Sequence, residues 1–170
     1  MITTFLQRLL WLAILVALQL VVFNHIHLFG YATPLVFVYF VTLFPLGTSR
    51  WNILLWAFAC GMQADITTLT PGVGAAAMTL TALVQPPLLE AMRPKDAPED
   101  MRATFHTLGF WHYVYYCGLL VTVFTLAYFL LQFFNFFHLE DMAISWASSL
   151  VLTWLVCILL EHVRGGKKEE

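Results

Sequence analysis

The chain has 170 residues, of which 61% are hydrophobic and only 11% are charged, and its net charge is −2. Soluble domains commonly carry about 25% charged residues, so a water-soluble core would not hide this much apolar surface. The small negative net charge also excludes the basic surface that nucleic-acid binding needs. We therefore predict an all-α integral membrane protein, in which residues 1–170 form a single polytopic membrane domain.

Six apolar segments are each close to the roughly 20 residues that a helix needs to cross about 30 Å of hydrocarbon. They lie at about 5–23, 27–46, 51–70, 71–85, 111–134 and 143–163. The second segment starts between residues 27 and 31, and the third ends between residues 64 and 70. A re-entrant third segment is the alternative to a full crossing. Pro86 and Pro87 are expected to end the fourth segment, because proline cannot donate a helical hydrogen bond.

The basic residues all lie near the chain ends or in alternate connectors between the segments. They are Arg8, Arg50, Arg93, Lys95, Arg102, Arg164, Lys167 and Lys168. The other connectors carry only acidic charges. Because Lys and Arg are enriched in cytoplasmic loops, this pattern predicts six crossings, with both termini and the connector 93–110 in the cytoplasm.

Asp65 is the most informative side chain, because a carboxylate within hydrocarbon costs roughly 2.5–3.5 kcal/mol. It lies about 21 Å along a helix that begins at Trp51, where no Lys or Arg is predicted. Thr70-Pro71 has the form of an N-cap followed by the first residue of a helix, whose positive end can receive the carboxylate. One interpretation of Asp65 is a local cap, for which Asp65→Asn is expected to be nearly harmless. The other is an anchor for a cationic group on a partner.

Small residues open the fourth segment. Gly72 and Ala76 have small-xxx-small spacing, and Gly61 lies near the end of the third segment. Small side chains let membrane helices approach closely. We expect Gly72 to serve helix packing within the chain, and a contact with a separate transmembrane partner is the alternative.

No residue pattern predicts catalysis, a metal site or a cofactor. The sequence lacks the nucleophile elbow, the P-loop and the HExxH zinc motif, and Asp65 has no second intramembrane aspartate with which to form a catalytic pair. His25 and His27 share one side of a strand but not of a helix, and no Cys or carboxylate lies nearby to complete a metal site. We therefore expect a protein that is not an enzyme.

Four short stretches resemble the rod shape-determining protein MreD family, most closely its Bacteroidetes-like branch. They are QLVVFNHIHLFGYATP over 19–34, PLGTSR over 45–50, GMQAD over 61–65 and TPG over 70–72. The length, the six expected crossings and their orientation also fit this family. The candidate interface or packing positions, seven from the resemblance and Ala76 from its small-residue spacing, are Gln19, Asn24, Pro34, Arg50, Gly61, Asp65, Gly72 and Ala76.

The resemblance implies a non-enzymatic scaffold of the bacterial cell-elongation machinery, which directs peptidoglycan synthesis from the cytoplasmic (inner) membrane. The expected partner is MreC, which has one membrane span. Together the two connect MreB filaments to the glycosyltransferase RodA and its class B penicillin-binding transpeptidase. The family is also considered similar in fold to the substrate-binding subunits of energy-coupling-factor transporters.

A small-molecule-binding or transport subunit is the alternative function. Such a subunit needs polar side chains that converge near mid-membrane. The predicted segments offer few, chiefly Gln19, Thr79, Thr81, Thr122 and the serines of 145–149. This thin set favours the scaffold. Recovery of MreC and RodA from native membrane would support the scaffold, whereas recovery of an ATPase pair would support transport.

Overall fold

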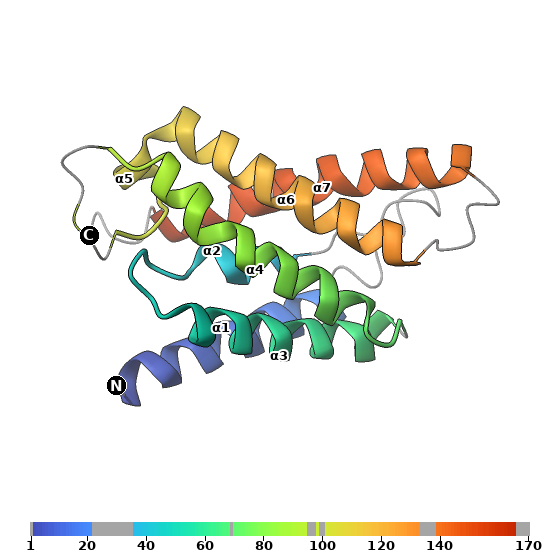
Figure 1. Ribbon diagram of the computed structural model, residues 1–170, viewed down its shortest axis with the longest axis horizontal. Helices are drawn as coiled ribbons and strands as arrows, with labels where there is room; N and C mark the ends of the chain where they lie inside the picture. The colour runs from blue at the N-terminus through green and yellow to red at the C-terminus, as the bar shows by residue number, and fades with distance from the viewer. Residues whose placement is uncertain are drawn as a thin grey trace.

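A computed structural model describes residues 2–21, 36–68, 70–94, 98, 101–132 and 139–165. Every regular element in these ranges is a helix, which confirms the all-α prediction (Figure 1). The helices are α1 (Ile2–Val21), α2 (Val38–Thr42), α3 (Arg50–Thr68), α4 (Val73–Ala91), α5 (Phe105–Leu108), α6 (Phe110–Gln132) and α7 (Leu139–Gly165).

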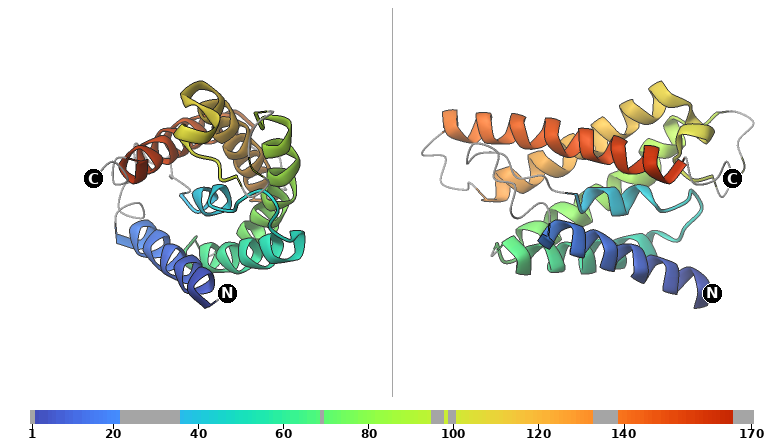
Figure 2. Two further views of the ribbon diagram at one scale, coloured as in Figure 1. Left: turned by 90° about the vertical axis from the view of Figure 1, so that its left-hand side faces the viewer. Right: turned by 180° about the vertical axis from the view of Figure 1, so that it is seen from behind.

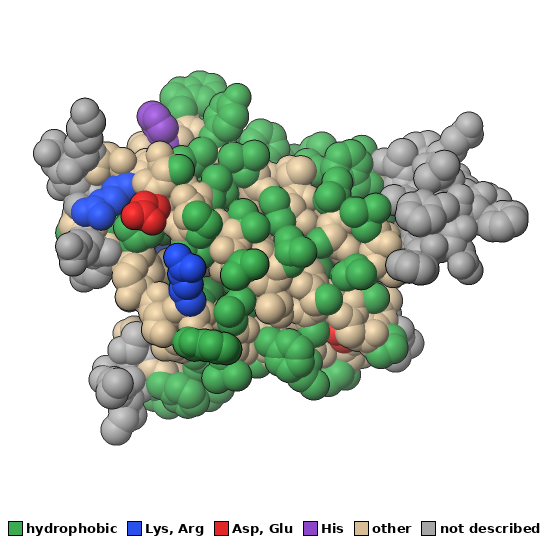
Figure 3. All heavy atoms as spheres, in the orientation of Figure 1, with side chains coloured by type: hydrophobic (Ala, Val, Ile, Leu, Met, Phe, Trp, Pro, Cys, Tyr) green, Lys and Arg blue, Asp and Glu red, His purple; other side chains and the backbone are tan. Residues whose placement is uncertain are grey.

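The last helix places polar residues inside the molecule and apolar residues outside. Its buried stripe, at most 2% exposed and recurring every four residues, consists of Ser149, Thr153, Cys157 and Glu161. Its opposite stripe, 49–71% exposed, consists of Val151, Leu155, Leu159 and Val163. Apolar side chains also cover the middle of the face drawn in Figure 3. A surface helix in water shows the reverse arrangement. Helix α7 therefore has the pattern of a helix whose outer face contacts lipid.

Two described helices are long and apolar enough to cross a bilayer, namely α6 and the Trp146–Arg164 part of α7. The apolar part of α1, Phe5–Gln19, is shorter. α3 and α4 have nearly the length of a crossing, but polar residues such as Asp65 and Gln85 interrupt their apolar sequences. These findings support an association with membrane, while the number of six crossings stays a prediction.

The long helices surround the short helix α2. Seen from the end that carries both termini, α1, α3, α4, α6 and α7 follow one another around α2 (Figure 2, left). Neighbours in this ring pack directly, with α3 against α4, α4 against α6, and α6 against α7. The beginning of α1 and the end of α7 lie at the same end of the helices (Figure 1).

The centre of the core comes from the predicted second crossing. All five residues of α2 are buried, and Tyr39 and Phe40 are among the largest fully buried side chains. The described part of the predicted segment 27–46 is helical only over Val38–Thr42, and its residues 27–35 lie outside the described ranges. The described part is therefore a short interior helix, packed against protein on all sides rather than against lipid.

The prediction that Pro86 and Pro87 end the fourth segment is wrong. Helix α4 continues through both prolines to Ala91. Leu89, which follows them, is fully buried, so packing holds this last turn despite the two missing backbone donors. After this helix the chain returns to the core, where Leu46 N–H donates to the carbonyl of Met101 at 2.8 Å.

A buried hydrogen-bond network joins α2 to the end of α7. The hydroxyl of Tyr39 donates to Glu161 Oε2 at 2.7 Å, and Arg164 Nη1 lies 3.3 Å from the same oxygen. Glu161 is only 2% exposed because Tyr39 and Arg164 cover it.

We predict that Tyr39→Phe destabilises the fold by roughly 1–3 kcal/mol, because it removes a hydrogen bond to a buried carboxylate. The measurement is the unfolding free energy of the purified protein in detergent. Tyr115→Phe is the matched control, since Tyr115 is 69% exposed and its loss of a hydroxyl should change little. Equal stability of the two variants would contradict the role of this network.

Candidate functional site

The carboxylate of Asp65 lies against the beginning of α4. Asp65 is in the last turn of α3 and is 7% exposed. Its Oδ2 accepts hydrogen bonds from the backbone N–H groups of Gly72 and Ala75, both at 3.0 Å. Its Oδ1 accepts one from Gly74 N–H and one from the Thr70 hydroxyl, the latter at 3.4 Å. Both oxygens are thus fully engaged by this chain.

These donors are the groups that the first turn of a helix leaves without partners. The first N–H groups of a helix have no acceptor within it, and its N-terminal end carries a partial positive charge. Gly72 occupies the N-cap of α4 and has no side chain with which to cap it. Asp65 supplies the missing acceptor from the neighbouring helix, so the carboxylate both caps α4 and fixes it to α3.

The N-cap prediction for Thr70 and Pro71 is wrong by two residues. Helix α4 begins at Val73 with Gly72 as its N-cap. Thr70 contributes differently, because its hydroxyl donates to Asp65 and lies 3.3 Å from the hydroxyl of Tyr128 on α6. The Asp65 contacts are those of the capping interpretation. The charge-anchor interpretation gains no support, because hydrogen bonds within the chain already occupy the carboxylate.

Helices α3 and α4 are in close contact at Gly61. A Cβ atom added to Gly61 would lie 2.5 Å from Ala75 Cα and 2.6 Å from the carbonyl oxygen of Gly74. One added to Gly74 would lie 2.7 Å from Asp65 Oδ1. Both contacts involve backbone or a fixed carboxylate, which cannot move aside cheaply. The pair Gly61 and Gly74 therefore sets the separation of α3 and α4.

The expectation that Gly72 serves helix packing is wrong. A Cβ atom at Gly72 would have no neighbour within 4 Å. Its φ angle of +86° is in the left-handed region, so the local turn rather than a helix contact requires glycine. Ala76 is also exposed, so its small size does not close the α3–α4 contact.

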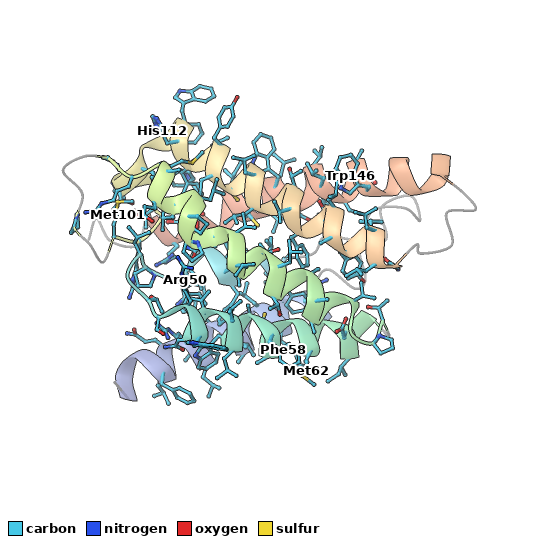
Figure 4. All side chains as sticks on the ribbon, viewed as in Figure 1. Arg50, Phe58, Met62, Met101, His112 and Trp146 are labelled. Atoms are coloured by element: carbon cyan, nitrogen blue, oxygen red, sulfur yellow. The ribbon has the colours of Figure 1, made fainter. Side chains whose placement is uncertain are left out.

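A wide apolar groove runs along the outer side of this helix pair, and we call it the α3–α4 groove. Its volume is about 1060 Å³. Small residues, Gly72, Ala75, Ala76 and Thr79, lie along it. Larger apolar side chains border it: Leu54, Phe58, Met62 and Ile66 from α3, and Leu80 and Leu83 from α4. Figure 4 shows Phe58 and Met62 along the outer edge of α3. Asp65 lines one end.

The remaining predicted positions do not join this site. Gln19 is 2% exposed, and its Oε1 accepts a hydrogen bond from Val36 N–H at 3.3 Å, which ties α1 to the beginning of α2. Arg50 is exposed at the other end of α3, about 22 Å from Asp65 along the helix (Figure 4). Asn24 and Pro34 lie outside the described residues, as do His25 and His27.

No family model, curated protein or solved structure matches the chain. The site is therefore interpreted from its own geometry.

We predict that Asp65→Asn destabilises the protein by roughly 1–3 kcal/mol. This differs from the expectation drawn from the sequence, in which Asp65→Asn is nearly harmless if Asp65 is a local cap. The asparagine amide keeps one oxygen, but its NH₂ group must face at least one of the backbone N–H groups that now donate to the carboxylate. The unfolding free energy in detergent checks this. Glu90→Gln, which neutralises an exposed acid of α4, should leave stability unchanged. Wild-type stability of Asp65→Asn would refute the two-oxygen cap.

A second prediction distinguishes the close-contact role of Gly61 from the backbone role of Gly72. Gly61→Ala should cost about 1–3 kcal/mol by forcing the backbones of α3 and α4 apart. Gly72→Ala should cost roughly 1–2 kcal/mol through its left-handed backbone alone. Cysteine crosslinking between α3 and α4 distinguishes the mechanisms, since only Gly61→Ala should change the separation of the helices. An unchanged crosslinking pattern in Gly61→Ala would rule out the close-contact role.

Proposed function

We propose that the chain is a non-enzymatic membrane scaffold that holds a transmembrane helix of a partner in the α3–α4 groove. The observation that carries the proposal is the groove itself, which is apolar, about 1060 Å³ in volume and exposed on the outside of the protein. Its lining residues come from α3, α4 and the turn before α4, and no other described element lines it.

The dimensions of the groove suit a helix. Its lining on α3 extends from Leu54 to Ile66, and on the other side it extends from Pro71, in the turn before α4, to Leu83 on α4. The α3 stretch is about 18 Å long at 1.5 Å per residue, which is more than half of the hydrocarbon thickness. Ala76 and Thr79 have small side chains, so α4 projects little into this part of the groove. Small residues allow a second helix backbone to approach closely in lipid.

The chemistry of the groove disfavours a polar small molecule. Its polar lining residues are Asp65 and Thr79. The carboxylate of Asp65 accepts hydrogen bonds from its own chain, and the hydroxyl of Thr79 donates to the carbonyl of Ala75 at 2.7 Å. Recognition of a polar substrate needs polar groups that converge on it. This argues against a transport subunit, the alternative function.

The resemblance to the MreD family supplies the identity of the occupant. In this proposal the single span of MreC lies in the groove, and the assembly belongs to the complex of MreB, RodA and its transpeptidase in the bacterial inner membrane. The chain crosses that membrane six times with both termini in the cytoplasm. Two observations support the orientation: both termini lie at one end of the helices, and Arg8, Arg102 and Arg164 meet at that end.

We predict that Ala76→Phe weakens the recovery of MreC on the order of tenfold, because a ring in the groove obstructs the incoming helix. Ala76 is exposed, so the protein itself should keep its stability. Ala147→Phe makes the same substitution at an exposed position of α7 outside the groove, and it should not affect recovery. The measurement is affinity purification from native membranes at equal expression, followed by mass spectrometry.

The same purification tests the other occupants. If Ala76→Phe releases a bound lipid and leaves MreC recovery unchanged, the groove is a lipid site and the proposal fails. Recovery of an ATPase pair in place of MreC and RodA would identify a transport subunit. Equal loss of MreC in Ala76→Phe and Ala147→Phe would place the contact elsewhere on the protein.

A further inference from the structure

Three arginines from separate parts of the chain meet around one small pocket, which we call the arginine pocket. Arg8 comes from α1, Arg102 from the segment before α5, and Arg164 from the end of α7. The cavity between them is about 50 Å³, which gives room for a small chemical group rather than a whole lipid. Gln7 adds an amide to its lining. Basic side chains from distant segments rarely converge without an anion, because their charges repel.

The arginines are held in place by aromatic rings. The guanidinium carbon of Arg8 lies 4.7 Å from the centre of the Phe44 ring, and that of Arg164 lies 5.7 Å from the Trp11 ring. A cation over an aromatic face is attracted by the negative face of the ring. These contacts hold the two guanidinium groups at the pocket, where Arg164 also donates to Glu161.

The positive charge of the pocket is only partly neutralised. Arg164 pairs with Glu161 at 3.3 Å, and within the described part of the chain no carboxylate pairs with Arg8 or Arg102. Arg8 and Arg102 line the same pocket of about 50 Å³, where like charges repel each other. Placing two such groups at one pocket is costly unless an anion joins them, so the described lining of the pocket carries a surplus of positive charge.

We propose that the arginine pocket binds a phosphate group, either in the headgroup of an anionic phospholipid or as free phosphate. Guanidinium groups donate paired hydrogen bonds that match the geometry of phosphate oxygens. The pocket lies at the end of the helices that carries both termini, where a headgroup would lie beside the last turn of α7. Basic pockets between membrane helices on the cytoplasmic side commonly bind anionic headgroups.

Native mass spectrometry of the purified full-length protein tests the lipid source. The protein in detergent is titrated with phosphatidylglycerol and, separately, with phosphatidylcholine, which carries no net charge. We expect the anionic lipid to be retained in preference. Arg102→Gln should weaken its binding about fivefold, as expected for one arginine near a lipid surface. Arg102 is exposed, so this variant should fold, and its thermal unfolding is measured first.

The matched control is Arg50→Gln, which removes the same charge from an exposed arginine outside the pocket. A second variant, Arg8→Lys, keeps the charge but loses the paired donors and should also weaken binding. Inorganic phosphate forms the other arm. If it raises the thermal stability of the wild type but not of Arg102→Gln, and no lipid preference is found, the ligand is free phosphate.

Two results would overturn the proposal. One is equal retention of both lipids together with no effect of inorganic phosphate. The other is an equal loss of binding in Arg50→Gln and Arg102→Gln, which would show a general charge effect rather than a site. Because the readout is lipid or phosphate binding, it is independent of partner recovery by the α3–α4 groove.

Discussion

The structure depends on one carboxylate, that of Asp65, which joins the end of α3 to the beginning of α4. Asp65 takes hydrogen bonds on both oxygens from the beginning of α4, at the point where that helix has unpaired N–H groups and a partial positive charge. A charge in an apolar setting is expensive, and so is an uncapped helix end without water. Bringing the two together removes both costs. The α3–α4 groove exists because this contact fixes both helices that border it.

Two close contacts, one ionic and one steric, act along the same pair of helices. Gly61 on α3 meets the backbone of Gly74 and Ala75, and the carboxylate of Asp65 meets the N–H groups of the same two residues. The hydrogen bonds can reach only if the helices are as close as glycine allows. The glycine contact is in turn held in register by the hydrogen bonds. This coupling places the small side chain of Ala76 beside the larger apolar side chains of α3, and the difference in size forms the groove.

The sequence makes the site visible only in part. An acid and a glycine stand out within apolar runs, so Asp65 and Gly61 were identifiable from residue type alone. The role of Gly72 was not, because one letter does not separate a glycine needed for positive φ from one needed for close contact. The burial of Glu161 depends on its contact with Tyr39, a residue 122 positions away in the sequence. Tyr39 itself lies in the predicted second segment, whose described part contains the interior helix α2.

Charged side chains are neutralised differently at the two ends of the helices. At one end the negative charge of Asp65 is neutralised by the backbone of α4, so no basic residue is needed there. At the other end Glu161 neutralises only Arg164, and the charges of Arg8 and Arg102 remain. Asp65 is therefore neutralised by backbone, whereas the described lining of the arginine pocket keeps positive charge. The cytoplasmic leaflet carries anionic lipids, whose headgroups can supply the counter-charge at the arginine end. The same surplus thus accounts for the proposed orientation and for the proposed phosphate ligand.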